Sequence, residues 1–280
     1  MKAWLKALAG GLLLGGPLYL YARFIETRWI EVKEIDIKLK NLHQNFDGYR
    51  IAQLSDMHMD QFVDFQLVAT AVDRVLENSP DLIAITGDFI SHEVEYDVKH
   101  ISQTLSRLKA PDGVVAIPGN HDYSDTGGTK EINDVRQIMY DLGIHDLSNE
   151  VRTLTRGDGE LHICGVDAIT AQKARLDYVL DALPEDGPAI LLAHEPDYAD
   201  IVAAYGRIDL QLSGHTHGGQ VRPPFYGTII GPNHGLRYGA GLFDINEDMQ
   251  LYVNVGLGTV TYPIRFNCRP EVTIITLRPA

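Results

Sequence analysis

The chain of 280 residues contains only two cysteines, Cys164 and Cys268. Two thiols are too few for a disulfide framework, and their scarcity disfavours a structural zinc site; we interpret both as small buried hydrophobic residues. Basic residues are also scarce, and the formal net charge is −14. Such acidity argues against a nucleic-acid partner, because binding to a phosphate backbone depends on clustered basic residues.

An uncharged apolar stretch extends from Ala7 to Ala22 at the N-terminus. Counted from residue 3, with Lys6 extending toward the interface, it has about 20 residues, or about 30 Å of helix, which is enough to cross a bilayer. We therefore predict an N-terminal membrane anchor in residues 1–29, contacting the membrane through residues 3–22. The expected location is the inner cell membrane, as a single-pass protein.

Two other interpretations of this stretch stay open, a cleaved signal peptide and a buried soluble helix. The segment after the apolar run shows no small-x-small cleavage motif, which favours the anchor. Basic residues flank both ends of the run, so the side of the membrane is undetermined. We find no repeat, low-complexity tract or linker in the rest of the chain, and we predict one domain over residues 30–280. Its oligomeric state is unknown.

Apolar strands and amphipathic helices alternate along this domain, which favours an α/β fold with much parallel sheet. The expected strands cover residues 34–39, 49–54, 81–86, 113–117, 151–155, 161–166, 189–192, 208–212, 241–245, 251–254 and 272–277. The expected helices cover residues 64–78, 96–109, 130–142, 173–181 and 197–204.

Five of these strands are followed directly by polar residues that are able to bind metal. The residues are Asp56 and His58, Asp88, Asn120 and His121, His194, and His215 and His217. In parallel α/β sheets, ligands collect beyond the carboxyl ends of the strands. Each residue alone has an ordinary structural explanation as a cap or turn, but together they would be costly to pack without a metal centre.

The segment Gly214-His215-Thr216-His217-Gly218 carries two histidines one residue apart. If the segment is extended, both imidazoles point to the same side and reach one point in space. The flanking glycines allow a sharp turn and a close approach of the backbone.

These motifs, in this order, resemble the calcineurin-like metallophosphoesterase family. They are Asp56-x-His58, Gly87-Asp88, Gly119-Asn120-His121-Asp122, His194 and Gly214-His215-x-His217. The sequence around the two histidines, the N-terminal segment and Pro263-Ile264-Arg265 are similar to the membrane-associated bacterial branch of the family. The resemblance implies a β-sandwich flanked by helices in four layers, α/β/β/α, preceded by one N-terminal membrane helix.

One position departs from the family pattern. The motif Gly-Asp-x-x-Asp reads Gly87-Asp88-Phe89-Ile90-Ser91 in this chain, so that Ser91 replaces the second aspartate. That position is not normally a metal ligand, and we expect the centre to be retained. The absence of tyrosine there argues against the iron–tyrosinate site of purple acid phosphatases.

The resemblance implies two divalent metal ions, one held by Asp56, His58 and His217 and the other by Asn120, His194 and His215, with Asp88 bridging them. The mixed oxygen and nitrogen ligands favour Mn, with Fe or Zn as alternatives. His121 would protonate the leaving oxygen, and Asp122 would orient His121 or its loop, or simply cap the loop. Arg265 would contact a substrate phosphate or form a structural salt bridge.

The implied activity is hydrolysis of a phosphodiester or pyrophosphate bond by a hydroxide shared between the metals. The expected substrate is a small-molecule or lipid-linked phosphodiester, such as UDP-2,3-diacylglucosamine. A phosphomonoesterase or protein phosphatase on the same site is the alternative, and a non-catalytic metal-binding scaffold is a third. Five other histidines match no motif, and we interpret them as non-ligands: His92, His100, His145, His162 and His234.

Overall fold

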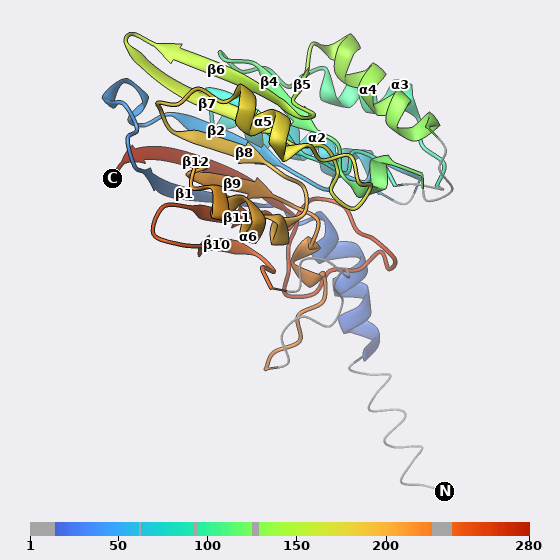
Figure 1. Ribbon diagram of the computed structural model, residues 1–280. Helices are drawn as coiled ribbons and strands as arrows, with labels where there is room; N and C mark the ends of the chain where they lie inside the picture. The colour runs from blue at the N-terminus through green and yellow to red at the C-terminus, as the bar shows by residue number, and fades with distance from the viewer. Residues whose placement is uncertain (1–14, 62, 92–93, 125–128, 226–236) are drawn as a thin grey trace, which may run out of the picture.

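The computed structural model of the protein describes residues 15–61, 63–91, 94–124, 129–225 and 237–280. Two six-stranded sheets pack face to face and helices cover both outer faces (Figure 1). The first sheet has the order β1 (Glu31–Leu39), β12 (Glu271–Pro279), β2 (Arg50–Leu54), β3 (Leu82–Thr86), β4 (Val114–Ile117) and β5 (His145–Asp146). The second has the order β10 (Gly241–Asp244), β11 (Gln250–Val253), β9 (Leu210–Ser213), β8 (Ala189–Leu192), β7 (Gly159–Gly165) and β6 (Glu150–Arg156).

Parallel pairing sets the direction of the strands that matter for function. In the first sheet β2, β3, β4 and β5 are all parallel, and in the second β7, β8, β9 and β11 are parallel. Among them β3, β4 and β8 are almost wholly apolar, because both faces of each sheet are covered. The carboxyl ends of each parallel set therefore lie along one edge of its sheet.

Three apolar clusters separate the four layers. The central cluster lies between the two sheets and includes Ile51, Ile163 and Leu212. The outer cluster of the first sheet packs against α2 (Phe65–Glu77), α3 (Val98–Leu105) and α4 (Lys130–Leu142). The outer cluster of the second sheet packs against α5 (Leu176–Ala182) and α6 (Ala199–Val202). This is the helix-flanked, two-sheet architecture that the sequence predicted.

Most predicted elements are found with shifts of a few residues at their ends. The helix predicted over residues 130–142 is α4 with the same bounds, because four buried residues recur at helical spacing and Gly143 ends it in the left-handed conformation. The helix predicted over residues 197–204 is shorter, since only α6 is α-helical and 3₁₀ turns flank it on both sides. Strand β5 was not predicted, and its two residues are too few for a periodic signal.

Residues 15–20 are helical, and the segment continues through the turns η1 (Tyr21–Ile25) and η2 (Glu26–Arg28). This end of the segment packs on the domain, because Ala22 and Glu26 are buried and the Ala22 carbonyl accepts a hydrogen bond from the Arg265 N–H. Across the described ranges, no helix combines the length and the apolar character that a membrane span needs. Much of the predicted anchor, residues 1–14, falls outside those ranges.

Candidate metal centre

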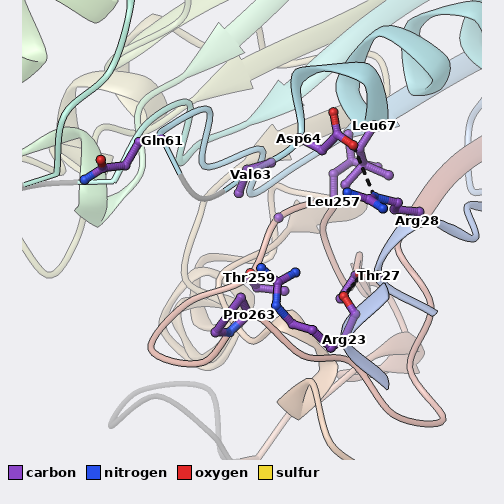
Figure 2. Close-up of a pocket in the computed structure, with 11 residues that line it drawn as sticks. Arg23, Thr27, Arg28, Gln61, Val63, Asp64, Leu67, Leu257, Thr259 and Pro263 are labelled. Atoms are coloured by element: carbon purple, nitrogen blue, oxygen red, sulfur yellow. Dashed lines mark hydrogen bonds and ion pairs between the residues drawn. The ribbon is translucent and has the colours of Figure 1, made fainter. Parts of the chain in front are cut away.

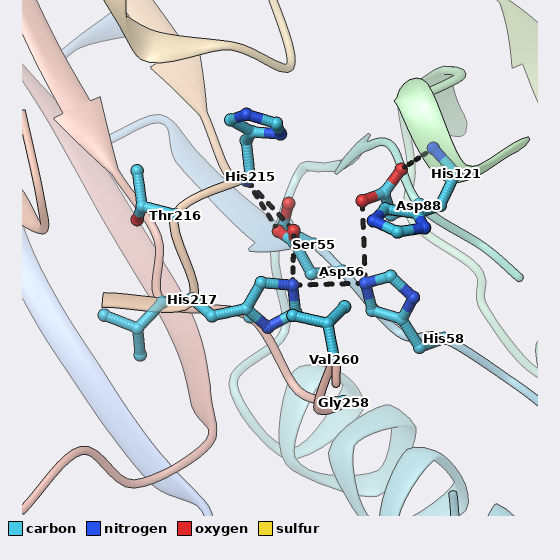
Figure 3. A network of polar contacts seen from close by, with 12 residues as sticks. Ser55, Asp56, His58, Asp88, His121, His215, Thr216, His217, Gly258 and Val260 are labelled. Atoms are coloured by element: carbon cyan, nitrogen blue, oxygen red, sulfur yellow. Dashed lines mark hydrogen bonds and ion pairs between the residues drawn. The ribbon is translucent and has the colours of Figure 1, made fainter. Parts of the chain in front are cut away.

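The predicted ligands come together at one edge of the two sheets, although they are spread from Asp56 to His217 along the chain. They follow five strands: Asp56 and His58 follow β2, Asp88 follows β3, Asn120 and His121 follow β4, His194 follows β8, and His215 and His217 follow β9. Figure 3 shows Asp56, His58, Asp88 and His217 pointing toward one another. Their ligand atoms all lie within 4.8 Å of each other, and all four residues are buried.

A first group of contacts joins Asp56, His58 and His217. The His58 and His217 Nε2 atoms are 3.1 Å apart, and His217 Nε2 lies 3.3 Å from Asp56 Oδ1. Ligand atoms bound about 2.1 Å from one ion stand roughly 3 to 3.4 Å from each other. The spacing of these three side chains therefore suits a shared ion.

A second group of contacts joins His194, His215 and Asn120 across the two sheets. His215 Nδ1 lies 2.7 Å from Asn120 Oδ1, and the His194 and His215 rings meet edge to face at 5.1 Å. His194 Nδ1 donates to the Thr86 carbonyl at 2.7 Å. The opposite ring nitrogen, Nε2, therefore faces into the site. This leaves the Nε2 lone pair available for a ligand.

The carboxylate of Asp88 lies between the two groups. Its Oδ2 atom is 3.5 Å from His58 Nε2 and 3.1 Å from His194 Nε2, whereas Oδ1 accepts the backbone N–H of His121 at 2.8 Å. Oδ2 is buried, and no donor among the described residues forms a hydrogen bond with it. An orphaned carboxylate oxygen between two sets of ring nitrogens is the arrangement that a bridging ligand requires.

Burial and charge explain why this cluster needs a cation. Asp56 and Asp88 are at most 1% exposed, and charges buried in this way are costly unless they are paired or bind metal. Burial raises the pKa of Asp56 to about 6. Burial also opposes the ionisation of Asp88, but attraction to His194 and His121 outweighs it and holds the pKa of Asp88 well below its ordinary value.

His58 and His215 are held in the neutral form that binds metal, whereas attraction to Asp88 outweighs burial and raises the pKa of His194 well above its ordinary value. Burial lowers the pKa of His58 to about 3 and that of His215 to about 4, so both rings are neutral near pH 7. The ring atoms His194 Nε2 and His215 Nε2 are buried without a hydrogen-bond partner. The neutral nitrogens, the orphaned atoms and the two carboxylates fit divalent metal ions well.

A hydrogen bond from outside the cluster orients His58. Ser91 Oγ lies 2.9 Å from His58 Nδ1, and Ser91 is 8% exposed. The contact directs Nε2 toward Asp88 and His217. The sequence identified Ser91 as a departure from the family motif but did not predict this contact.

Five of the candidate ligands have a backbone conformation that non-glycine residues rarely adopt. Their φ angles are positive: Asp56 49°, His58 46°, Asp88 55°, His215 70° and His217 50°. Such conformations typically cost about 1–3 kcal/mol each and cluster at functional sites. The strands thus turn sharply as they leave the sheet, which directs the next side chains into the site. The sequence carries no signal for this feature.

Two glycines allow the loops to approach one another. A Cβ on Gly119 would collide with the Asp88 carboxylate, and a Cβ on Gly214 would collide with Ser55 and Asp56. Gly214 therefore has the close-approach role that the sequence predicted. Residues 215–217 are not extended, because β9 ends at Ser213 and His217 begins a 3₁₀ turn. The two rings consequently enter different contact groups.

His121 and Asp122 have separate positions. The His121 ring packs edge to face against His58, with centroids 5.0 Å apart, and it is partly exposed. Asp122 is fully buried and accepts backbone N–H groups from Phe89, Ile90 and Gly119 at 2.8–3.1 Å. Burial, followed by repulsion from Asp88, raises its pKa to about 7. Asp122 thus ties together the loops that carry Asp88 and Asn120.

Arg265 does not have either of the predicted roles. It has no exposed surface, and its guanidinium donates to the backbone carbonyls of Val255, Gly256, Gly258 and Cys268. Burial lowers its pKa. The phosphate contact is a wrong prediction, because this side chain is enclosed and its N–H groups are already occupied. Arg265 instead holds the loop in which Gly256 packs against Asp56.

The histidines predicted to be non-ligands have other contacts where they are described. His162 bonds Thr153 and the Asp186 carbonyl, His100 stacks on Phe65, and His145 pairs with Glu150. His92 and His234 lie outside the described residues.

Comparison with known proteins defines the class. The family model for calcineurin-like phosphoesterases matches residues 49–219, which span every candidate ligand. The chain belongs to this family and is a metal-dependent phosphoester hydrolase.

Individual relatives carry the names metallophosphoesterase or phosphodiesterase. The chain is 36% identical over 280 residues to the uncharacterized metallophosphoesterase YkuE of Bacillus subtilis, covering 99% of this chain and 96% of that protein. It is 31% identical to phosphodiesterase YaeI of Escherichia coli, covering 92% of each. A zebrafish (Danio rerio) transmembrane protein with a metallophosphoesterase domain is 28% identical, with 96% of this chain and 62% of that protein covered.

Among solved structures, the NAD nucleotidase of Haemophilus influenzae superposes with a TM-score of 0.50 at 14% identity, over 74% of this chain and 45% of that one. This similarity concerns the fold alone.

Proposed function

We propose that the protein is a two-metal phosphodiesterase that hydrolyses phosphodiester or pyrophosphate bonds. The observation that carries the proposal is the position of Asp88 Oδ2, orphaned and close to both His58 and His194. In this proposal Asp56, His58 and His217 hold one divalent ion, Asn120, His194 and His215 hold the other, and Asp88 contacts both. Mn is the proposed metal, with Fe or Zn as alternatives, because the ligands are oxygen and neutral nitrogen.

The protein's own residues would position the phosphate and move protons. When bound, a pair of divalent ions neutralises phosphate charge and lowers the pKa of water at the site. His121 is proposed to protonate the leaving oxygen, which its partly exposed ring beside His58 supports. Asp122 would keep this loop in place through its three backbone hydrogen bonds.

A diester preference is supported by the name of the E. coli relative, phosphodiesterase YaeI, and by the retained His121, which would assist a poor leaving group. The test compares bis(p-nitrophenyl) phosphate with p-nitrophenyl phosphate on Mn-loaded protein. We expect kcat/KM to be higher for the diester and to disappear with a chelator. A higher value for the monoester would favour the phosphomonoesterase alternative. Bound metal without turnover of either would favour a scaffold.

The proposed substrate is a membrane- or lipid-related phosphodiester such as UDP-2,3-diacylglucosamine. Support comes from the apolar N-terminal run, from the exposed Leu18, Leu20 and Ile25 at its described end, and from the relative named as a transmembrane protein. We also propose a location in the inner cell membrane with a single N-terminal anchor. The full-length protein should remain in the membrane fraction after alkaline carbonate extraction, and release of the intact chain would contradict the anchor.

A further inference from the structure

A pocket of about 380 Å³ lies between the N-terminal segment and the loops beside the metal ligands (Figure 2). Arg23, Thr27 and Arg28 form one wall, and Gln61, Asp64 and Thr259 contribute polar groups to the others.

Gly258 links this pocket to the metal centre. It lines the pocket, its N–H donates to the Asp56 carbonyl at 2.7 Å, and a Cβ added to it would collide with the His58 Cβ. The pocket and the candidate ligands therefore share one loop but involve different side chains.

The pocket carries positive charge in an otherwise acidic protein. Figure 2 shows the Arg23 side chain directed toward Thr259 and Pro263. Within the described ranges no carboxylate pairs with Arg23. Its guanidinium carbon lies 5.1 Å from the centroid of the Phe24 ring. Arg28 pairs with Asp64 at 3.1 Å, but both side chains are about half exposed, so solvent weakens the pair. The net effect is one unneutralised guanidinium beside hydrogen-bonding side chains, which suits an anion.

An apolar surface adjoins the pocket on the same segment. Leu20, Phe24 and Ile25 are 55%, 49% and 54% exposed, although each is a large hydrophobic side chain. Apolar residues next to arginine and hydroxyl groups match the boundary between acyl chains and head groups in a bilayer. A soluble anion would satisfy the arginine but would leave these side chains in water. A lipid would satisfy both.

We propose that this pocket binds the phosphate-bearing head group of an anionic membrane lipid, with the acyl chains against Leu20, Phe24 and Ile25. The lipid is distinct from the phosphate that reacts at the metal centre. Its binding would hold the Leu257–Thr259 side of the active site at the membrane surface. This inference does not depend on which phosphoester the enzyme hydrolyses.

The test titrates full-length protein in neutral-detergent micelles with dioctanoyl phosphatidylglycerol, measured by calorimetry. We expect binding by the wild-type protein, with dioctanoyl phosphatidylcholine weaker. Arg23→Gln should weaken phosphatidylglycerol binding roughly five- to tenfold, the value of one well-placed cation near an anionic head group. The matched control is Arg278→Gln, at the opposite end of the strands beside Asp36 and Asp47, which should leave binding unchanged.

Further measurements distinguish lipid binding in this pocket from binding at the metal centre and from a simple anion site. Asp88→Asn should bind the lipid as the wild type does, and loss of binding in that variant would place the lipid phosphate on the metal centre and overturn the inference. Inorganic phosphate should show no Arg23-dependent binding at comparable concentration, and such binding would identify a simple anion site instead. Equal lipid affinities for wild type and Arg23→Gln, checked with Arg28→Gln as a second variant, would also overturn it. Turnover of bis(p-nitrophenyl) phosphate, measured separately, tests the proposed function alone.

Discussion

The hydroxyl of Ser91 lies 2.9 Å from Nδ1 of His58, at the position where the family motif carries aspartate. The contact fixes which nitrogen of His58 faces Asp88 and His217. Partners of this kind typically contribute 10–100-fold to metal affinity or activity. Ser91 thus orients His58 within the cluster, although a serine stands where the motif has an aspartate.

Replacing Ser91 with alanine should weaken Mn binding by about tenfold, because His58 loses the partner that orients it. Ser91→Asp should retain metal affinity, since a carboxylate also accepts the Nδ1–H. Equilibrium dialysis with Mn measures both. Ser106→Ala, which removes a hydroxyl from an exposed helix end, is the control. An unchanged affinity in Ser91→Ala would mean that the ring is held by packing alone.

The N-terminal segment is tied to the metal centre through Glu26. This carboxylate is 1% exposed and accepts the Cys268 N–H at 2.6 Å, while Cys268 Sγ contacts the His217 carbonyl at 3.3 Å. Glu26→Ala leaves a buried N–H without a partner, which costs about 1–3 kcal/mol, whereas Glu26→Gln keeps an acceptor oxygen. We expect lower stability and weaker metal binding in the alanine variant and substantial rescue in the glutamine variant.

Urea unfolding and Mn titration of the two Glu26 variants provide the readouts. Loss of stability with unaltered metal affinity would show that the segment supports the fold but not His217.

The role proposed for His121 predicts a dependence on the leaving group. His121→Ala should keep both metals and lose about 10²–10⁴-fold in turnover of diesters with poor leaving groups. The loss should shrink as the leaving-group pKa falls, because a good leaving group needs no proton. His145→Ala, at an exposed histidine paired with Glu150, is the matched control. A uniform loss across the series would assign His121 to substrate binding instead.

The close approach at Gly119 can be tested by adding one methyl group. A Cβ there would collide with the Asp88 carboxylate, so Gly119→Ala should displace Asp88, reduce metal binding and cost about 1–3 kcal/mol of stability. Gly239→Ala adds the same atom where no neighbour lies within 4 Å and should be within about 0.5 kcal/mol of wild type. Similar effects in both variants, measured by urea unfolding, would contradict the steric explanation.

The sequence predicted the framework because long elements leave periodic patterns. Helix α4 repeats its apolar residues at helical spacing, and β3 and β8 are continuous apolar runs bounded by polar motifs. The polar, metal-binding residues that follow the strands also indicated which side chains meet. Parallel strands deliver their carboxyl ends to one edge, so motifs distant in sequence become neighbours.

The local geometry was not predictable for a different reason. Left-handed backbone at Asp56 or Asp88 is uncommon for any non-glycine residue, and the surrounding packing selects it. Arg265 was misassigned because composition does not reveal that a guanidinium is enclosed by backbone carbonyls. The turn at His215 and His217 lies at the same edge and likewise leaves no pattern in the sequence, since the strand ends at Ser213.

The central claim is that two metal ions share Asp88, and metal counting tests it most directly. Protein loaded with Mn, desalted and analysed by inductively coupled plasma mass spectrometry should contain about two ions per chain. Asp88→Asn should lose metal and hydrolysis of bis(p-nitrophenyl) phosphate together, with the Arg278→Gln control unaffected. One ion per chain in the wild type, or full turnover by Asp88→Asn or by chelated wild-type protein, would contradict the account.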